Sequence, residues 1–135
     1  MSIGQILALV AAGIAVIVSG IGSSKGVGMA GEVAAGISTE KPEVNSKLLV
    51  LQLLPATQGI YGFLIAIIML INTGVLAGAM LPVTLEQGIS FVIGSLPIAI
   101  IGYYSAVKQA RVSTASMLMT GEKPEMSGKG ITMTV

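Results

Sequence analysis

Long uncharged runs dominate the chain, and three of them are long enough to cross a membrane. Ile3–Ser24, Leu48–Leu85 and Gln87–Val107 contain no acidic or basic residue. A transmembrane helix needs about 20 mostly apolar residues. The middle run exceeds that length, so we interpret it as one span from Leu48 to about Asn72, followed by the weakly polar turn TGVLAGAMLPVT. The pattern predicts an all-α membrane protein with three transmembrane helices.

A charged segment occurs twice, as STEKPEVNSK at 38–47 and as TGEKPEMSGK at 120–129. In both copies a long helical run precedes the KPE turn and another helical run follows it. Pro42 and Pro124 suit a helix break or the first turn of the next helix. We interpret the two copies as an internal duplication that makes two tandem helical hairpins.

The duplication predicts a single membrane domain over residues 1–135, with a first hairpin at 3–73 and a second at 84–135. After the second KPE turn the sequence continues only over Met126–Val135. That length of helix is about 15 Å, or half a bilayer. We therefore expect a truncated fourth helix. The alternative is a natural three-span protein with a short tail.

Composition supports a membrane protein and excludes several kinds of chemistry. The chain is 53% hydrophobic and 10% charged, whereas a soluble domain has roughly 25% charged residues. It contains no Cys and no His, which excludes thiol catalysis, disulfides and zinc sites built from those residues. The formal net charge of +1 gives no indication of nucleic-acid binding.

The basic residues predict how the chain lies in a cell membrane that it crosses several times. All 7 Lys and Arg residues fall at the KPE ends of the predicted spans, and none lies in the 73–85 connection. Positively charged loops remain in the cytoplasm. We expect the KPE turns in the cytoplasm, with the 73–85 turn and the N-terminus outside.

Glycines are unusually dense in the first span and its extension. Small residues let helices approach closely in lipid, so this density is typical of the crowded inner wall of a ring. One tight contact with the second helix is the alternative. The stretch GVGMAG at 26–31 also matches G-x-G-x-x-G, but it lies inside a helical run without a βαβ unit, which argues against dinucleotide binding.

The stretch LQLLPATQGIYGF at 51–63 places polar groups inside an apolar span. Pro55 cannot donate a backbone hydrogen bond and clashes with the carbonyl one turn earlier, so carbonyls near it can turn outward. Thr57 adds a hydroxyl and Gln58 an amide oxygen. Neutral oxygens grouped within about one turn suit a hard cation such as Na⁺.

Gln109 on the third predicted helix is a candidate partner of Gln58. Counted from the cytoplasmic turns, the two amides lie about 21 Å and about 16 Å up their helices, so they can share a level. Interhelical hydrogen bonding is an equally good interpretation of the pair. No carboxylate lies at this depth, and we expect an acid on the missing part of the fourth helix.

Together, SGIGSSKGVGMAGE, LQLLPATQGIYGF, SLPIAIIGYYS and KQARV resemble the proteolipid of V-type rotary ATPases, the bacterial and archaeal subunit K, over nearly the whole chain. The resemblance implies a four-helix protein of a membrane ring that turns against a stator. It implies a non-catalytic subunit, because ATP is hydrolysed or made elsewhere in such complexes. The implied partners are other copies of the chain, the stator membrane subunit, the central stalk and lipid.

The resemblance also assigns an ion site. In sodium-transporting members a leucine carbonyl, Thr and Gln of helix 2, a Gln of helix 3 and a Glu of helix 4 hold the ion. The first four correspond to Leu54, Thr57, Gln58 and Gln109, and the essential Glu is expected just beyond Val135. Tyr61 and Pro55 have supporting roles.

These observations predict a rotor-ring subunit that carries Na⁺, or less readily H⁺, with no covalently bound cofactor. The abundance of neutral oxygens favours Na⁺, because a proton carrier needs mainly a carboxylate and a donor. The main alternative is a structural ring subunit without a working site, because the helix 4 carboxylate is absent. A small multidrug antiporter is disfavoured, because Ile3–Ser24 has neither an acid nor an aromatic residue.

Overall fold

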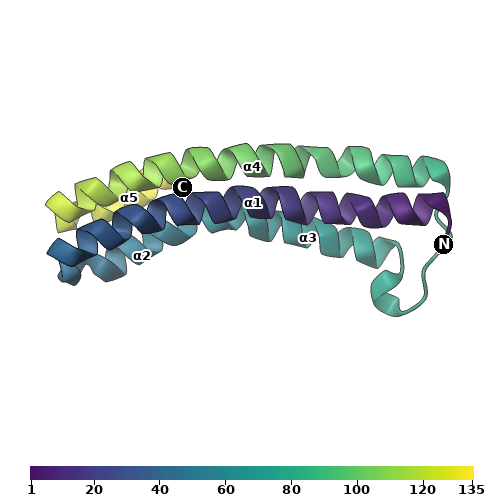
Figure 1. The fold of residues 1–135 in the computed structure, drawn as a ribbon, viewed down its shortest axis with the longest axis horizontal. Coiled ribbons are helices and arrows are strands. Elements are labelled where there is room, and N and C mark those ends of the chain that lie inside the picture. Colours follow the sequence, from purple (N-terminus) through teal and green to yellow (C-terminus); the bar gives the residue numbers. More distant parts are fainter. The chain divides into compact units, whose positions relative to one another are not determined.

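The computed structural model describes residues 1–135, and every regular element in it is helical (Figure 1). The α-helices are α1 (Ile3–Glu40), α2 (Asn45–Leu53), α3 (Thr57–Asn72), α4 (Leu85–Glu122) and α5 (Ser127–Thr134). Single 3₁₀ turns separate them: η1 (Pro42–Val44), η2 (Leu54–Ala56), η3 (Val75–Ala77) and η4 (Pro124–Met126).

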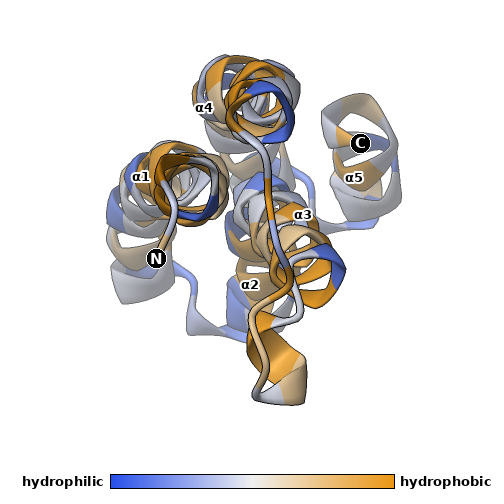
Figure 2. Cartoon of the chain, turned by 90° about the vertical axis from the view of Figure 1, so that its right-hand side faces the viewer, coloured by the Kyte–Doolittle hydropathy of each residue, from blue (hydrophilic) through white to orange (hydrophobic).

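Three helical segments are long and apolar enough to cross a membrane: Ile3–Glu40, Pro42–Asn72 and Leu85–Glu122. The predicted all-α membrane fold, with three long helices and a short fourth, is thereby confirmed. Large apolar side chains also remain exposed on these helices. Figure 2 shows the orange of hydrophobic residues along α1, α3 and α4. Helices that are apolar on every side need lipid or another protein around them.

The helices extend well beyond the uncharged runs. Both α1 and α4 have 38 residues and continue past the basic residues that mark the ends of the runs. Each begins with the same pair of reciprocal hydrogen bonds, between Ser2 and Gln5 in α1 and between Thr84 and Gln87 in α4. This capping box satisfies backbone N–H groups that a first helical turn leaves without partners.

The chain forms two compact units, and each contains parts of several helices. Unit 1 comprises Met1–Ile21 and Gln58–Tyr103, and unit 2 comprises Gly22–Thr57 and Tyr104–Val135. The predicted division into hairpins at 3–73 and 84–135 follows the chain and remains a prediction.

Unit 1 packs through small residues. Its core contains Ala11 and Ala12 of α1 with Ala66 and Met69 of α3. At Gly62 of α3 the helices come so close that a Cβ atom would overlap the Ser19 hydroxyl. The connection between α3 and α4 turns at Gly74 and Gly78, whose φ angles of 74° and 77° favour glycine.

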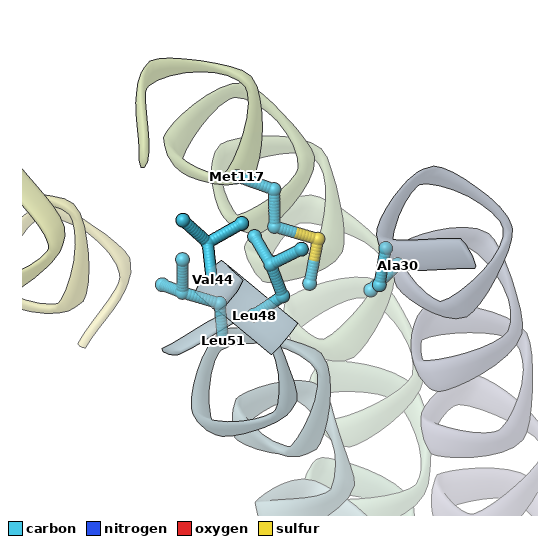
Figure 3. Close-up of a cluster of buried hydrophobic side chains, with 6 residues drawn as sticks. Ala30, Val44, Leu48, Leu51 and Met117 are labelled. Atoms are coloured by element: carbon cyan, nitrogen blue, oxygen red, sulfur yellow. The ribbon is translucent and has the colours of Figure 1, made fainter. Parts of the chain in front are cut away.

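Unit 2 has a core of larger side chains, drawn in Figure 3. Val44, Leu48 and Leu51 meet Met117 of α4 and the alanines Ala30 and Ala34 of α1. These residues are at most 6% exposed. The core lies beside the two KPE turns, which belong to the same unit.

Only some of the α1 glycines contact another helix of the chain. A Cβ at Gly26 would meet Pro55 and Ala110, and one at Gly31 would meet Gln52. By contrast, Gly13, Gly20, Gly28 and Gly36 have open space where a side chain would be. Close packing with the helix that follows the first KPE turn therefore accounts for a part of the glycine density.

Candidate ion-binding site

Pro55 interrupts the second membrane-spanning segment. The α-helix ends at Leu53, one 3₁₀ turn covers Leu54–Ala56, and α3 begins at Thr57. Proline has no N–H to donate to the carbonyl four residues earlier, which is that of Leu51. The tighter 3₁₀ turn is the local solution that the backbone adopts.

The Leu51 carbonyl obtains its hydrogen bond from another helix. Ser113 of α4 is buried and donates its hydroxyl to this oxygen at 2.5 Å. The bond replaces the donor that Pro55 removes, so the Leu51 carbonyl keeps a hydrogen-bond partner. It also fixes α4 against α2 one turn from the break.

Leu54 and Thr57 place two oxygens side by side. The Thr57 hydroxyl donates to the Leu54 carbonyl at 3.0 Å, and the backbone N–H of Thr57 bonds the same oxygen. Two oxygens at this separation can contact one cation, because a hard ion gathers several oxygen ligands around it. A backbone carbonyl and a hydroxyl therefore lie side by side at the 3₁₀ turn that contains Pro55.

Gln109 lies on α4 within the same unit. Its amide Nε2 donates to the Thr134 carbonyl at 2.9 Å, which orients the side chain towards α5. Ala110 is close to Pro55, since both approach the same point at Gly26. Gln109 therefore stands on the turn of α4 that faces the break.

Gln58 and Tyr61 belong to unit 1. Gln58 is half-buried, and its Cβ lies 4.0 Å from the point that a Cβ on Gly102 of α4 would occupy. Tyr61 is 54% exposed. The expected approach of Gln58 to Gln109 joins residues of two different units and remains a prediction.

A buried polar stripe on α4 was not predicted from the sequence. Ser113, Ser116 and Thr120 follow Gln109 at helical spacing, and all three are buried. Besides the Ser113 bond to Leu51, the Ser116 hydroxyl lies 3.2 Å from that of Thr134. The sequence shows the helical spacing of these small hydroxyl residues, but the spacing does not indicate which helices they contact.

The arrangement is one of neutral oxygens. No group of three or more His, Cys, Asp or Glu side chains could hold a metal ion in this structure. Leu54, Thr57 and Gln109 instead offer a carbonyl, a hydroxyl and an amide. Such a set can replace the water shell of a monovalent hard cation, and it lacks the carboxylate that would balance the charge.

Comparison with known proteins identifies the family. The profile of the ATP-synthase C family matches residues 10–69. The V-type sodium ATPase subunit K of Enterococcus hirae is 45% identical over 128 residues, which cover 95% of this chain and 78% of that protein. This chain belongs to the proteolipid family of rotary ATPases.

A second relative extends the comparison to archaea. The A-type ATP synthase subunit K of Methanocaldococcus jannaschii is 48% identical over 65 residues, which cover 48% of this chain and 30% of that protein. Proteolipids of this family are non-catalytic ring subunits of rotary ATPases. The predicted family and the predicted lack of catalysis are thus confirmed, and the protein is a membrane-embedded component of ion transport.

Proposed function

We propose that this chain is the rotor-ring subunit that carries Na⁺ across the membrane, with Leu54, Thr57, Gln58 and Gln109 as ligands. The observation that supports it most strongly is the break at Pro55, where the Leu54 carbonyl and the Thr57 hydroxyl lie 3.0 Å apart. The sodium ATPase subunit from Enterococcus hirae, as a relative at 45% identity, supports the choice of ion.

Gln109 completes the ligand set from the neighbouring helix. The Ser113 bond to Leu51 holds α4 against the chain one turn from Leu54, and the Thr134 carbonyl orients the Gln109 amide. Gln58 contributes a second amide from α3. Amides and hydroxyls bind a cation without being titrated, which favours Na⁺ over H⁺.

The charge of the ion requires a carboxylate, which we propose just beyond Val135. Residues that continued α5 would come next to Gln109, because the Gln109 amide already bonds the carbonyl of Thr134. A carboxylate there would neutralise the ion while the site faces lipid. Pro55 supports the site by opening the helix. Tyr61 supports it from a position about one turn beyond Gln58 on α3.

The subunit acts as part of a homo-oligomeric ring. Na⁺ enters from a half-channel of the stator membrane subunit, binds at the break, travels with the ring and leaves on the other side. The central stalk transmits the rotation to the subunits that handle ATP. The open glycines of α1, Gly13, Gly20, Gly28 and Gly36, suit close packing against neighbouring copies.

Charge orients the subunit in the cell membrane. All 7 basic residues lie in unit 2, which also contains both KPE turns. Unit 1 contains the N-terminus and the 73–84 connection. The positive-inside rule therefore places the KPE turns in the cytoplasm and the N-terminus outside.

Sodium binding by the purified complex tests the proposal. Thr57→Val removes one oxygen ligand and should weaken Na⁺ binding about tenfold, which corresponds to about 1.4 kcal/mol. Thr114→Val is the matched control, because the Thr114 hydroxyl also bonds a carbonyl three residues earlier, that of Arg111. Isotopic Na⁺ binding at fixed pH measures the affinity of each variant.

The two competing functions give different results in the same assay. Unchanged Na⁺ affinity in Thr57→Val, with normal proton transport, would exclude this Na⁺ site and indicate a proton carrier. A ring that binds neither ion would indicate the structural subunit without a working site. Loss of binding in both Thr57→Val and Thr114→Val would show only a damaged helix packing.

A further inference from the structure

The two halves of the chain repeat in structure as well as in sequence. Each element of the second half begins at the same offset from its counterpart in the first half. The corresponding pairs are α1 and α4, η1 and η4, and α2 and α5. The helices α1 and α4 are equal in length, and their capping boxes occupy equivalent positions.

The two KPE turns have the same backbone geometry. The N–H of Lys41 bonds the carbonyl of Ile37 at 2.9 Å, and the N–H of Lys123 bonds that of Met119 at 2.9 Å. The φ angles of the two lysines are −135° and −133°. A three-residue 3₁₀ turn that begins with proline follows each of them. Equivalent residues of the two turns can therefore make equivalent contacts.

Lysines of the first turn bind the second turn of the same chain. The Lys41 ammonium donates to the Gly121 carbonyl at 2.6 Å, and the Lys47 ammonium donates to the Pro124 carbonyl at 3.0 Å. The last carbonyls of a helix lack intrahelical donors and carry partial negative charge, which a cation offsets. The first repeat thus holds the end of α4 and the start of η4 by one charged hydrogen bond each.

The equivalent groups of the second repeat face outward. Lys123 and Lys129 correspond to Lys41 and Lys47, and both are exposed. The carbonyls equivalent to those of Gly121 and Pro124 belong to Thr39 and Pro42, residues that are also exposed. The second repeat therefore has two exposed lysines, and the first repeat has exposed residues that carry the matching carbonyls.

We propose that Lys123 and Lys129 of one copy bind the Thr39 and Pro42 carbonyls of the next copy, and that these bonds join neighbouring subunits at the cytoplasmic rim. The inference rests on the proposed ring. In a ring the contacts are head-to-tail, and each subunit presents two different surfaces to its neighbours. Within one chain, the first repeat contacts the second. In a ring of tandem repeats, the second repeat of one copy can make the same contact with the first repeat of the next copy.

The donor and acceptor atoms of the contact are present in both repeats, although the repeats differ in sequence. The acceptors are backbone carbonyls, so the replacement of Gly121 by its counterpart Thr39 leaves the acceptor atom in place. Charge supports the same pairing, because Glu40 and Glu43 flank the acceptor turn. An arriving lysine of another copy meets both carbonyls and acidic side chains.

Cross-linking of introduced cysteines tests the contact, since the chain contains none of its own. The double variant K129C/E43C places thiols on the two proposed partner surfaces. A short bis-maleimide should link neighbouring copies of the assembled protein into a ladder of dimers, trimers and larger species. The double variant K47C/E125C, at the equivalent positions of the contact within the chain, is the control and should give a cross-linked single chain.

Native mass spectrometry of the same samples separates failure of this contact from failure of the ring. If the ring mass is present and K129C/E43C yields no ladder, the contact is wrong and the ring function stands. If no ring mass is found, the proposed function itself fails. A ladder from K47C/E125C would also overturn the inference, because that contact would then lie between chains.

Charge-neutralising variants test whether the lysines contribute to assembly. K123M/K129M should lower the fraction of ring that survives a given concentration of sodium dodecyl sulfate, and the conservative K123R/K129R should retain it. Equal ring survival in the Met and Arg variants would show that the ammonium groups make no contact between copies.

Discussion

Units 1 and 2 of the molecule use different means to hold helices together. In unit 1, α1 and α3 approach mainly through the small residues Ala11, Ala12, Ala66 and Gly62, with Met69 as the one large buried side chain of that core. In unit 2, larger side chains fill the core, and side chains of one element bond the backbone of another. The basic residues of the chain are all in unit 2.

The difference shows where polar groups are useful in a membrane helix protein. Small residues give close contact without the cost of placing polar groups in hydrocarbon. Unit 2 accepts that cost at Ser113, because Pro55 leaves the Leu51 carbonyl without its helical donor, and at Gln109, which donates to the Thr134 carbonyl. These polar bonds lie in the same unit as the candidate ligands Leu54 and Thr57.

The largest expected effect concerns the core of unit 2. Leu48→Ala should lower the free energy of unfolding by about 2–5 kcal/mol, because it leaves a cavity where Leu48 is now fully buried. Leu49→Ala, at a neighbouring position that is 47% exposed, should change it by less than about 0.5 kcal/mol. Circular dichroism during detergent denaturation measures both. Equal losses would show that unit 2 has no specific core.

A second pair of variants tests the small-residue packing of unit 1. Gly62→Ala should cost about 1–3 kcal/mol, because the new Cβ would overlap Ser19 and lie 2.5 Å from the Ala15 carbonyl. Gly13→Ala should stabilise the isolated, unassembled subunit by up to about 1 kcal/mol, since no other atom of the chain lies close to the new Cβ. The same denaturation assay applies, and a stable Gly62→Ala variant would contradict the close approach.

A third set tests the polar contact beside the break. Ser113→Ala should cost about 1–3 kcal/mol, because the buried Leu51 carbonyl loses its donor. In a Pro55→Ala background the same change should cost much less, since residue 55 then supplies an N–H to that carbonyl. Ser90→Ala is the control, because the exposed Ser90 hydroxyl bonds only within its own helix, to Glu86.

This double-mutant cycle isolates the link between the proline and the serine. Additive losses in the combined variant would show that Ser113 does not compensate for Pro55. A coupling of about 1 kcal/mol or more would confirm that the two residues act on one carbonyl.

The smallest expected effect concerns the KPE turns. Lys41→Met should cost about 0.3–1 kcal/mol, because the Gly121 carbonyl at the end of α4 loses its cation. The difference from the native protein should decrease at high salt, where charges are screened. Lys41→Arg retains the charge and serves as the control. A loss that is independent of salt would indicate side-chain packing as its cause.

The sequence predicted the membrane fold well, because its evidence is local. Uncharged length identifies a spanning helix, and the prolines at 42, 55 and 124 each coincide with the start of a 3₁₀ turn or its second residue. Pro97 shows the limit of the rule. It lies inside α4, which continues as one helix from Leu85 to Glu122. A proline thus indicates a possible break, and its surroundings decide whether the helix changes.

The candidate site was only partly predictable. Thr57 and Gln109 stood out as polar residues in apolar spans, and the structure adds how they are held: Thr57 by the Leu54 carbonyl, and Gln109 by that of Thr134. Ser113 gave no comparable signal, since it follows the basic residues that mark the end of the uncharged run. Its importance depends on the carbonyl of Leu51, which is far away in sequence.

By itself, the sequence determined that the chain is a membrane protein of long helices, that its second half repeats the first, and which polar residues lie in the spans. These properties follow from the composition and spacing of neighbouring residues. Only the tertiary structure decided which carbonyl Ser113 satisfies, which glycines of α1 are covered, and that the lysines of one KPE turn bind the other. Such contacts join residues distant in the chain, and their partners are backbone atoms, which every residue carries and no sequence pattern distinguishes.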